Sequence, residues 1–411
     1  MSQMDIITDL LGIQGWEVVE NGVERTDEEI IVHIERTEHT GYQCAGCNQP
    51  FMIAYDHLPQ RMVRDFPAWG RRCYLSFSPA RVACPDCGTH TEALEWIEPR
   101  ERHTLRFEKY VASLCSILPV LDVAAHLEMD KNAVYRIDRK WLGRREQQRQ
   151  HRPVRYLGID EISVQKGMKF ATLFYDLERR EVIGGVRTRR QRAVSGFFRR
   201  WGKEACKQVV AVCADLWTPY HASIKRYLKK AVLVFDKFHV FKYLSEAIDA
   251  TRRDEQNNAL CDEDKALIKG TRWLWLRKRH KLRRKQKVRL DEIMAVNENL
   301  QKAYLLKEDF EGFYESESAE EASAYLEAWT QRCNESELKH FKKLARRLNR
   351  WKQGILAHYE HPINNGVAEG LNNKIKVLKR RSYGFHDFAY FILKIMDITG
   401  ALPPLSEVTH T

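Results

Sequence analysis

Two patterns of hydrophobic and polar residues divide the N-terminal part of the chain. The first hundred residues alternate short apolar–polar runs with turns, for example at Glu29–Ile34 and Arg72–Phe77, and this alternation predicts β-strands. From about Thr104 to Leu142 the apolar residues recur at helical spacing instead. A polar tract at Arg144–Arg152, closed by a proline, then indicates a linker. We therefore expect a β-rich domain over residues 1–100 and a helical domain with its linker over residues 101–152.

Residues 153–241 have the pattern of an α/β domain. In order, we expect strands at Arg155–Val164, Lys169–Leu177 and Glu181–Val186, a helix near Ala193–Lys203, a strand at Val209–Ala214, a helix at Pro219–Leu228 and a strand at Ala231–Phe235. Three strands followed by helix–strand–helix–strand is the order of a ribonuclease-H-like α/β core. Residues 242–358 are charged and helical in period, which predicts an all-α insertion. Residues 359–400 would complete the core with its final helices, and residues 401–411 would form a C-terminal tail.

Composition narrows the class of protein. The 411 residues include 68 Lys and Arg against 56 Asp and Glu, a formal net charge of +12, which favours a polyanionic partner. Hydrophobic residues, at 44%, exclude a largely disordered chain. No run reaches the ~18 apolar residues of a membrane span, and the start lacks the basic segment of a signal peptide. We therefore expect a cytoplasmic protein without a membrane partner, in which the ten cysteines bind metal or are buried rather than forming a disulfide framework.

Four of the cysteines have the spacing of a zinc site. Cys44 and Cys47 form one Cys-x-x-Cys pair and Cys84 and Cys87 form another, 84 − 47 = 37 positions further on. Each pair can place two thiolates on one turn, and two such turns complete a tetrahedral four-sulfur site for one structural Zn²⁺. Four buried thiols without metal are the alternative, and the repeated spacing makes that the weaker interpretation.

The segment from Val120 to Leu142 has the inward positions of a helix-turn-helix unit. Its small and apolar residues are Val123, Ala124, Leu127, Met129, Val134 and Ile137. Asp130 would cap the second helix, and Glu128 occupies the turn position where glycine is commoner. The second helix would then expose to a DNA major groove Lys131, Asn132, Tyr135, Arg136, Arg139 and Lys140. An ordinary helical hairpin is the alternative.

Two acidic residues at strand ends indicate metal-dependent chemistry. Asp160 lies in the first apolar strand of the α/β domain, and Asp215 ends the fourth. In the ribonuclease-H-like order these two strands are neighbours, so the two carboxylates would face each other. With a third acid they can bind two Mg²⁺ ions about 3.5–4 Å apart, the arrangement for in-line phosphoryl transfer. Either aspartate alone could simply be a turn former at the end of a strand.

The third acid should come from a helix near the end of the domain. Glu369 begins a segment in which Leu371, Ile375 and Leu378 recur at helical spacing and would face the core. The neighbouring face would present Glu369, Asn372, Asn373, Lys376, Lys379 and Arg380. An acid followed by amides and cations fits a metal ligand bordered by DNA phosphate contacts. A solvated helix face is the alternative.

With these residues in place, the chain resembles bacterial insertion-sequence transposases of the ISL3 family, which carry a DDE catalytic domain. The resemblance runs in order through nearly the whole chain, on the two cysteine pairs and on Val123–Leu127, Gly158–Glu161, Ala214–Tyr220, Phe235–Val240, Thr271–Leu274, Glu369–Lys376 and Arg381–Phe385. It implies that the protein cleaves double-stranded DNA at element ends and joins the 3′ ends to target DNA. Two Mg²⁺ ions per active site, or Mn²⁺ in their place, would be the cofactors.

Carried over by position, the resemblance implies the catalytic triad Asp160, Asp215 and Glu369. Asp236 also ends an apolar strand and, with His239, forms a motif typical of the family. Strand order favours Asp215 as the metal ligand and leaves Asp236 and His239 as groups that position it. The spacing 369 − 215 = 154 exceeds that of a plain core and agrees with an inserted helical domain.

The insertion contains the densest basic tract of the chain. Its cations are Arg272, Arg277, Lys278, Arg279, Lys281, Arg283, Arg284, Lys285, Lys287 and Arg289, with no acid between them. Such a tract suits contact with the DNA backbone, and the interleaved Trp273 and Trp275 could stack on an unpaired base or pack in the core.

Two other functions use the same residues. A DNA-binding regulator descended from such an enzyme would have lost one of the three acids, and all three are present. A ribonuclease-H-like nuclease would need neither a zinc module nor a helix-turn-helix. We therefore expect a DNA transposase that acts as a homodimer or higher oligomer on DNA and is associated with the nucleoid.

Overall fold

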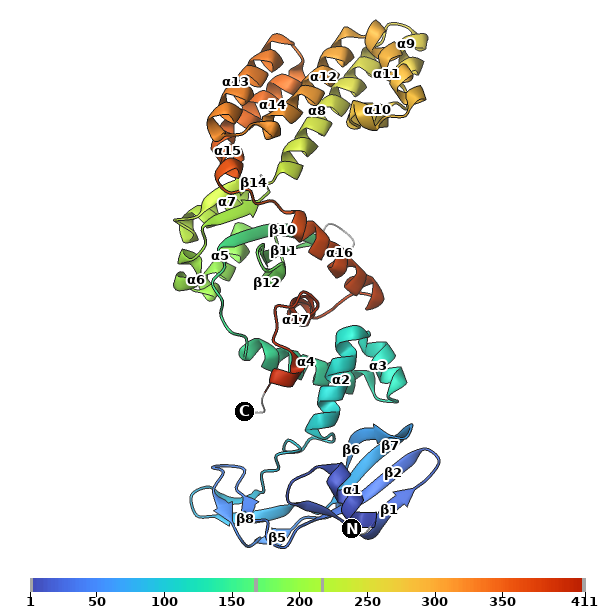
Figure 1. The fold of residues 1–411 in the computed structure, drawn as a ribbon, viewed down its shortest axis with the longest axis vertical. Coiled ribbons are helices and arrows are strands. Elements are labelled where there is room, and N and C mark those ends of the chain that lie inside the picture. Colours follow the sequence, from blue (N-terminus) through green and yellow to red (C-terminus); the bar gives the residue numbers. More distant parts are fainter. Residues whose placement is uncertain (1–2, 166–168, 216–217, 409–411) are drawn as a thin grey trace. The chain divides into compact units, whose positions relative to one another are not determined.

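The computed structural model describes residues 3–165, 169–215 and 218–408 (Figure 1). The chain folds into two compact units. The first comprises Met1–Arg149 together with Leu402–Thr411, and the second comprises Gln150–Ala401. Residues 216 and 217, part of a segment that carries the family resemblance, lie outside the described residues.

A four-stranded sheet forms the base of the first unit. Its strands, in spatial order, are β1 (Trp16–Arg25), β2 (Glu29–Arg36), β7 (Arg71–Phe77) and β6 (Arg61–Ala68), with α1 (Gln3–Leu11) packed against β1. Alternate residues of β2 are buried, as the apolar–polar alternation predicts, so both strands expected in this region are confirmed. The cysteine pairs are carried by two small sheets formed by β3 (Tyr42–Gln43) with β4 (Pro50–Phe51) and by β5 (Asp56–His57), β8 (Ala80–Cys84) and β9 (Gly88–Thr91).

Three helices follow, and they confirm the predicted helix-turn-helix. They are α2 (Leu105–Ile117), α3 (Val120–His126) and α4 (Lys131–Gln147). The six inward residues predicted from the sequence all belong to one hydrophobic cluster. Asp130 caps α4 by accepting the backbone N–H groups of Asn132 and Ala133. Glu128 has a φ of +51°, the left-handed conformation for which glycine is commoner in this turn.

The last described residues of the chain return to these helices. Leu405 and Val408 pack in the same hydrophobic cluster as α2, α3 and α4. The carbonyl of Pro403 accepts Arg145 Nε–H at 2.6 Å, and the carbonyl of Val408 accepts Lys109 Nζ–H at 3.3 Å. Residues 402–408 are therefore part of the helix-turn-helix core.

A five-stranded mixed sheet forms the centre of the second unit. Its spatial order is β12 (Glu181–Val186), β11 (Lys169–Asp176), β10 (Tyr156–Gln165), β13 (Ala211–Ala214) and β14 (Val232–Phe235). β10, β11 and β12 are antiparallel neighbours, whereas β13 is parallel to β10 and β14 is parallel to β13. The first and fourth strands of the domain are therefore adjacent, as expected from the order of elements.

Helices cover both faces of this sheet (Figure 1). One hydrophobic cluster joins the sheet to α5 (Gln191–Trp201), α6 (Lys203–Lys207) and α7 (Thr218–Tyr227). A second cluster joins the other face to α16 (Gly366–Arg381) and α17 (Phe388–Ile398). The sheet is thus buried between two helical layers. Because β13 and β14 are parallel, their carboxyl ends lie at the same end of the sheet.

The segment between β14 and α16 is helical. It comprises α8 (Lys237–Asn258), α9 (Asp262–Ile268), α10 (Arg272–Leu276), η1 (Arg279–Lys281), α11 (Arg284–Val296), α12 (Glu298–Asp309), η2 (Phe310–Glu315), α13 (Ala319–Glu335), α14 (Lys339–Arg350) and α15 (Lys352–Glu360). These helices share one hydrophobic core. α8 starts directly after Asp236, five residues before the boundary expected at 242. In the described part of the chain, no helix combines the length and apolar character that crossing a membrane requires.

Candidate active site and nucleic-acid interface

The candidate active site begins with three aspartates at neighbouring parallel strands. Ala214 of β13 and Phe235 of β14 pair with each other, and Ala214 also pairs with the residue before Asp160 in β10. Asp160, Asp215 and Asp236 are therefore the next residues along three adjacent strands. Because neighbouring strands lie about 4.8 Å apart, successive carboxylates of such a row interact electrostatically.

Asp160 is anchored through both of its carboxylate oxygens. Oδ1 accepts the backbone N–H of Glu161 at 2.8 Å, and Oδ2 accepts Nδ2–H of Asn372 at 2.8 Å. Burial, together with the charges of Asp236 and Asp215, raises the pKa of Asp160 to about 6. The site therefore concentrates negative charge in a place where the charged form is costly.

His239 joins the other two aspartates of the row. Its Nδ1 lies 3.1 Å from Oδ1 of Asp215, and its Nε2 lies 4.0 Å from Oδ2 of Asp236. Asp236 also caps α8, because its side chain accepts the backbone N–H of Phe238 at 3.4 Å. Burial raises the pKa of Asp236. Asp236 thus has a structural role at the start of α8, in addition to its position beside Asp215.

Helix α16 brings Glu369 to the same region. Asn365, the residue before the helix, donates from Nδ2 to the backbone carbonyl of Ile159 at 3.3 Å, and Asn372 contacts Asp160. Glu369 lies four residues after Asn365 and three before Asn372, so the three share one helix face. Glu369 is exposed. Among the described residues, its carboxylate does not form with Asp160 and Asp215 a group whose ligand atoms all lie within 4.8 Å.

One residue of α16 differs from the expected exposed face. Asn372 is only 6% exposed and binds Asp160, so it is not placed to contact DNA phosphate. Asn372 lies on the buried stripe of the helix, four residues after Ala368 and three before Ile375. Asn373, Lys376 and Arg380 are exposed, as predicted.

The donor set at the row fits a hard divalent cation. Carboxylate oxygens are the ligands that Mg²⁺ prefers. The raised pKa values of Asp160 and Asp236 show that burial and mutual repulsion oppose their charged forms, and a bound cation would relieve both effects. In addition, Oδ1 of Asn365 is buried, and the described residues supply no hydrogen-bond donor for it.

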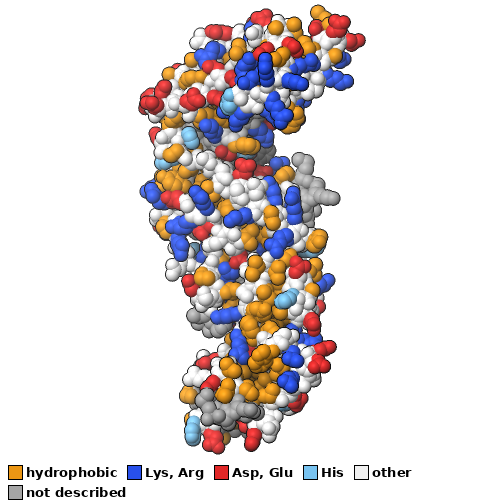
Figure 2. Space-filling view, turned by 45° about the vertical axis from the view of Figure 1, so that its right-hand side comes forward, with side chains coloured by type: hydrophobic (Ala, Val, Ile, Leu, Met, Phe, Trp, Pro, Cys, Tyr) orange, Lys and Arg blue, Asp and Glu red, His pale blue; other side chains and the backbone are white. Residues whose placement is uncertain are grey.

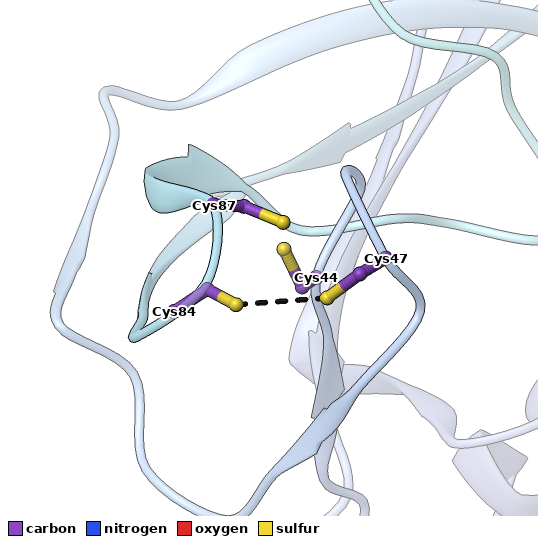
Figure 3. A group of neighbouring side chains, drawn as sticks. All are labelled: Cys44, Cys47, Cys84 and Cys87. Atoms are coloured by element: carbon purple, nitrogen blue, oxygen red, sulfur yellow. Dashed lines mark hydrogen bonds between the residues drawn. The ribbon is translucent and has the colours of Figure 1, made fainter.

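The structure brings the four predicted zinc ligands together. The sulfur atoms of Cys44, Cys47, Cys84 and Cys87 all lie within 4.8 Å of one another and converge on one point (Figure 3). Sγ of Cys47 is 3.5 Å from Sγ of Cys84, near the ~3.8 Å edge of a tetrahedron with Zn–S bonds of about 2.3 Å.

The thiols of this group favour a bound metal. The backbone N–H of Gly46 lowers the pKa of Cys44 to about 7, whereas the neighbouring Cys47 and Cys84 thiols raise the pKa of Cys87 to about 12. The close approach of the four sulfur atoms opposes the charged form of Cys87, and a bound cation would offset this repulsion. The Cys₄ group fits zinc binding.

The surface of α4 presents most of the residues predicted to read DNA. Lys131, Asn132, Arg136 and Arg139 are exposed, and Tyr135, whose hydroxyl accepts Arg139 Nη1–H at 3.3 Å, is half-buried. These side chains form a basic surface along one helix, as a major-groove reader requires.

Lys140 differs from the other predicted DNA contacts. Its Nζ lies 2.6 Å from Oε2 of Glu108, 3.1 Å from Glu98 and 3.5 Å from Glu101. Glu108 is buried and also accepts Nε1–H of Trp141 at 3.1 Å. Because three carboxylates already surround this ammonium group, Lys140 holds α4 in place and is not available to DNA. Glu101, His103 and Glu108 are also close enough together to hold a metal ion. The ammonium group of Lys140 already lies beside the two glutamates and balances their charge.

The basic tract of the insertion separates into paired and solvent-facing cations. Arg279 forms a two-point ion pair with Asp291, and Lys278 lies 2.8 Å from Glu311. The exposed members that could meet a DNA backbone include Arg277, Arg283 and Arg284. On the face drawn in Figure 2, lysine and arginine side chains gather on this helical part of the second unit.

The two tryptophans of the tract have different environments. Trp275 is 0% exposed and donates Nε1–H to Oγ1 of Thr271 at 3.0 Å, so it is a core residue. Trp273 is 63% exposed, with the Arg272 guanidinium 5.4 Å from its ring centroid. Trp275 therefore packs in the core, whereas stacking of Trp273 on an unpaired base stays a prediction.

Sequence reasoning did not find three polar residues that organise the site. Asn365 and Asn372 contact β10, and Tyr175 of β11 donates its hydroxyl hydrogen to Oδ1 of Asn372 at 2.6 Å. The sequence feature that could have indicated Asn365 and Asn372 is the presence of amides at helical spacing around Glu369. This feature is equally typical of a solvent-exposed helix face.

The combination of a strand-end carboxylate row, a helix-turn-helix and a four-cysteine group defines the class of DNA-processing transposases. Comparison with known families agrees. Residues 157–395 match a family model described as a transposase, and residues 92–142 match the helix-turn-helix domain of transposase family ISL3. The chain belongs to the ISL3 family of DDE transposases.

Individual proteins similar to this chain are also described as transposases. The chain is 33% identical to the transposase for insertion sequence element IS1001 of Bordetella parapertussis, over 82% of this chain and 83% of the relative. It is 26% identical to the transposase for insertion sequence element IS1557 of Mycobacterium tuberculosis, over 82% of this chain and 81% of the relative.

Proposed function

We propose that this protein cleaves DNA at the ends of an insertion sequence by metal-dependent phosphodiester hydrolysis and joins the freed 3′ ends to target DNA. The observation that carries the proposal is the row of carboxylates on adjacent strands of a sheet with the order 3-2-1-4-5. That order is the one expected of a ribonuclease-H-like core.

In this proposal Asp160, Asp215 and Glu369 hold two Mg²⁺ ions. Bound there, the ions supply activation of water or a 3′-hydroxyl and stabilisation of the leaving oxygen. Asp160 contributes a carboxylate whose two oxygens are already oriented by Glu161 and Asn372. Glu369, on the exposed side of α16, would supply the third carboxylate once metal is bound. No covalent protein–DNA intermediate is required.

Asp236 and His239 position Asp215 in this scheme. His239 contacts both aspartates, and Asp236 fixes the start of α8. The ring therefore limits the rotamers of Asp215. A group of this kind tunes a ligand without binding metal itself.

DNA recognition is assigned to two basic surfaces. Base-specific contacts come from α4, through Lys131, Asn132, Tyr135, Arg136 and Arg139. Backbone contacts come from the basic tract and from the exposed face of α16, including Arg277, Arg283, Arg284, Asn373, Lys376 and Arg380. A homodimer or higher oligomer would bring two element ends together. One Zn²⁺ held by the four cysteines stabilises the β-rich module.

The test is cleavage and strand transfer on a DNA fragment that carries the element end. Asp160→Ala, Asp215→Ala and Glu369→Ala should each abolish both steps while end binding persists, because each deletes a metal ligand. Glu204→Ala, which removes an exposed acid of the same unit, should keep both activities. Asp236→Ala should reduce activity less than Asp215→Ala.

The outcomes separate the alternatives. End binding without cleavage by the wild type would favour a DNA-binding regulator. Cleavage of structured nucleic acid without joining would favour a nuclease. Normal strand transfer by Asp215→Ala, with a folded but inactive Asp236→Ala, would show that Asp236 is the second metal ligand.

A further inference from the structure

A chain of hydrogen bonds connects the interior of the second unit to Asp160. The hydroxyl of Tyr175 donates to Oδ1 of Asn372 at 2.6 Å, and Nδ2–H of Asn372 donates to Oδ2 of Asp160 at 2.8 Å. Tyr175 is 0% exposed, and Asn372 is almost fully buried. Water is therefore largely excluded from these bonds.

The direction of these bonds is determined by their donors and acceptors. A phenol hydroxyl that donates to an amide must face its oxygen, so the NH₂ group of Asn372 is turned toward Asp160. The reversed amide would place its oxygen against the carboxylate. Tyr175 therefore selects the orientation in which Asn372 binds the charged form of Asp160.

These hydrogen bonds also join three elements that are distant in sequence. Tyr175 comes from β11, Asp160 from β10 and Asn372 from α16. Asn365 makes a second contact between α16 and β10, two helical turns earlier. Gly158 permits this approach, because a Cβ there would lie 3.3 Å from Oδ1 of Asn365 and 2.7 Å from the Leu177 side chain.

We propose that Tyr175 and Asn372 are positioning residues that orient the Asp160 carboxylate for metal binding and hold the helix that carries Glu369 against β10. The proposal rests on the metal-binding role proposed for Asp160. Both oxygens of Asp160 are held by N–H donors, so the remaining lone pairs have fixed directions. We call the two hydrogen bonds Tyr175–Asn372 and Asn372–Asp160 the relay. Loss of the relay would allow the carboxylate to rotate and would weaken the metal site without removing a ligand.

The test measures binding of Mn²⁺ alone to the full-length protein in the absence of DNA, by titration calorimetry. Mn²⁺ prefers oxygen ligands over thiolates, so the cysteine group contributes little to the measurement. Asn372→Ala should weaken Mn²⁺ binding by about 10- to 100-fold, the effect typical of residues that orient a ligand. Tyr175→Phe, which keeps the ring and removes only the hydroxyl, should weaken it by about tenfold or less.

The chain offers a matched control. Asn373 is the next residue of the same helix, is exposed and has the same side chain. Its Oδ1 accepts Nζ–H of Lys376 at 3.2 Å. Asn373→Ala should leave Mn²⁺ affinity within about twofold of the wild type, because it changes none of the bonds to Asp160 and its proposed DNA contact has no part in a titration without DNA. Thermal unfolding of each variant would show whether it is folded.

A double variant distinguishes a relay from two independent structural effects. Because Tyr175 acts through Asn372, Tyr175→Phe should cause no further loss of affinity when it is added to Asn372→Ala. Additive losses would overturn the proposal, as would wild-type affinity in folded Asn372→Ala. If Asp160→Ala also binds Mn²⁺ as the wild type does, the metal role of Asp160 fails. If only Asp160→Ala loses affinity, the relay alone fails.

Discussion

Replacing Lys140 with alanine should destabilise the helix-turn-helix rather than merely remove a DNA contact. The ammonium group lies 2.6 Å from Glu108, whose side chain is 1% exposed, and within 3.5 Å of Glu98 and Glu101. Its removal leaves the Glu108 carboxylate buried with only the Trp141 N–H as its remaining partner among the bonds described above.

The size of the effect follows from burial. Breaking a fully buried ion pair costs about 3–5 kcal/mol, because one charge remains without its partner. The Lys140 side chain is 24% exposed, so hydration of the ammonium group reduces the net effect. We therefore expect Lys140→Ala to lower the local free energy of opening by about 2–3 kcal/mol.

This loss should depend on pH. Burial raises the pKa of Glu108. In the variant, the carboxylate is protonated as pH falls through that raised pKa, which removes the unpaired charge. The deficit in stability should therefore be largest above the raised pKa and should shrink below it.

Hydrogen exchange of α2 and α4 peptides in the full-length protein measures this opening directly. A loss of about 2–3 kcal/mol corresponds to exchange about 30- to 160-fold faster. Lys131→Ala, at the exposed start of the same helix, is the control and should leave exchange unchanged. Exchange in Lys140→Ala within threefold of the wild type at neutral pH would refute the reasoning.

Three further changes should have distinct results. Cys84→Ser should reduce the zinc content from about one per chain and unfold the cysteine-bearing sheets, as measured by elemental analysis and circular dichroism. Arg136→Ala should cost about 1–3 kcal/mol of discrimination between element-end and random DNA, whereas Arg284→Ala should weaken both alike and reduce the salt slope by about 1. Deletion of residues 402–411 should destabilise the helix-turn-helix core, by about 1.5–3 kcal/mol for the loss of Val408 alone, as measured by thermal unfolding.

Each of these predictions has a result that contradicts it. Zinc-free protein that stays folded would show that the cysteines do not need metal. Unchanged discrimination by Arg136→Ala would remove α4 as the reader of DNA sequence. End binding and unfolding that are unaffected by the deletion would show that the C-terminal segment contributes nothing to the core.

Several elements could be predicted from local pattern alone. The alternation at Glu29–Ile34, the inward positions of the helix-turn-helix and the Asp130 cap each depend on residues within one or two turns or strands. The spacing of the two cysteine pairs also predicted that the four sulfur atoms meet. Each pair forms a local turn that supplies two ligands, and a four-sulfur zinc site needs two such turns. Strand order placed Asp160 beside Asp215, since parallel strands end at a common edge.

Polar partnerships depended on the tertiary structure. Asp160 and Asn372 are separated by 212 positions, and Lys140 and Glu98 by 42. In sequence, Asn372 and Lys140 look like members of exposed helix faces, because a helical pattern shows which side is apolar but not which other element covers the polar side. The packing of α16 on β10 buried Asn372, the packing of α4 beside α2 and the segment before it half-buried Lys140, and both contacts supplied the partners of these residues. The packing of Val408 in the helix-turn-helix core has the same cause. Leu405 and Val408 are two apolar residues in a short segment, and the sequence does not show which distant elements bury them.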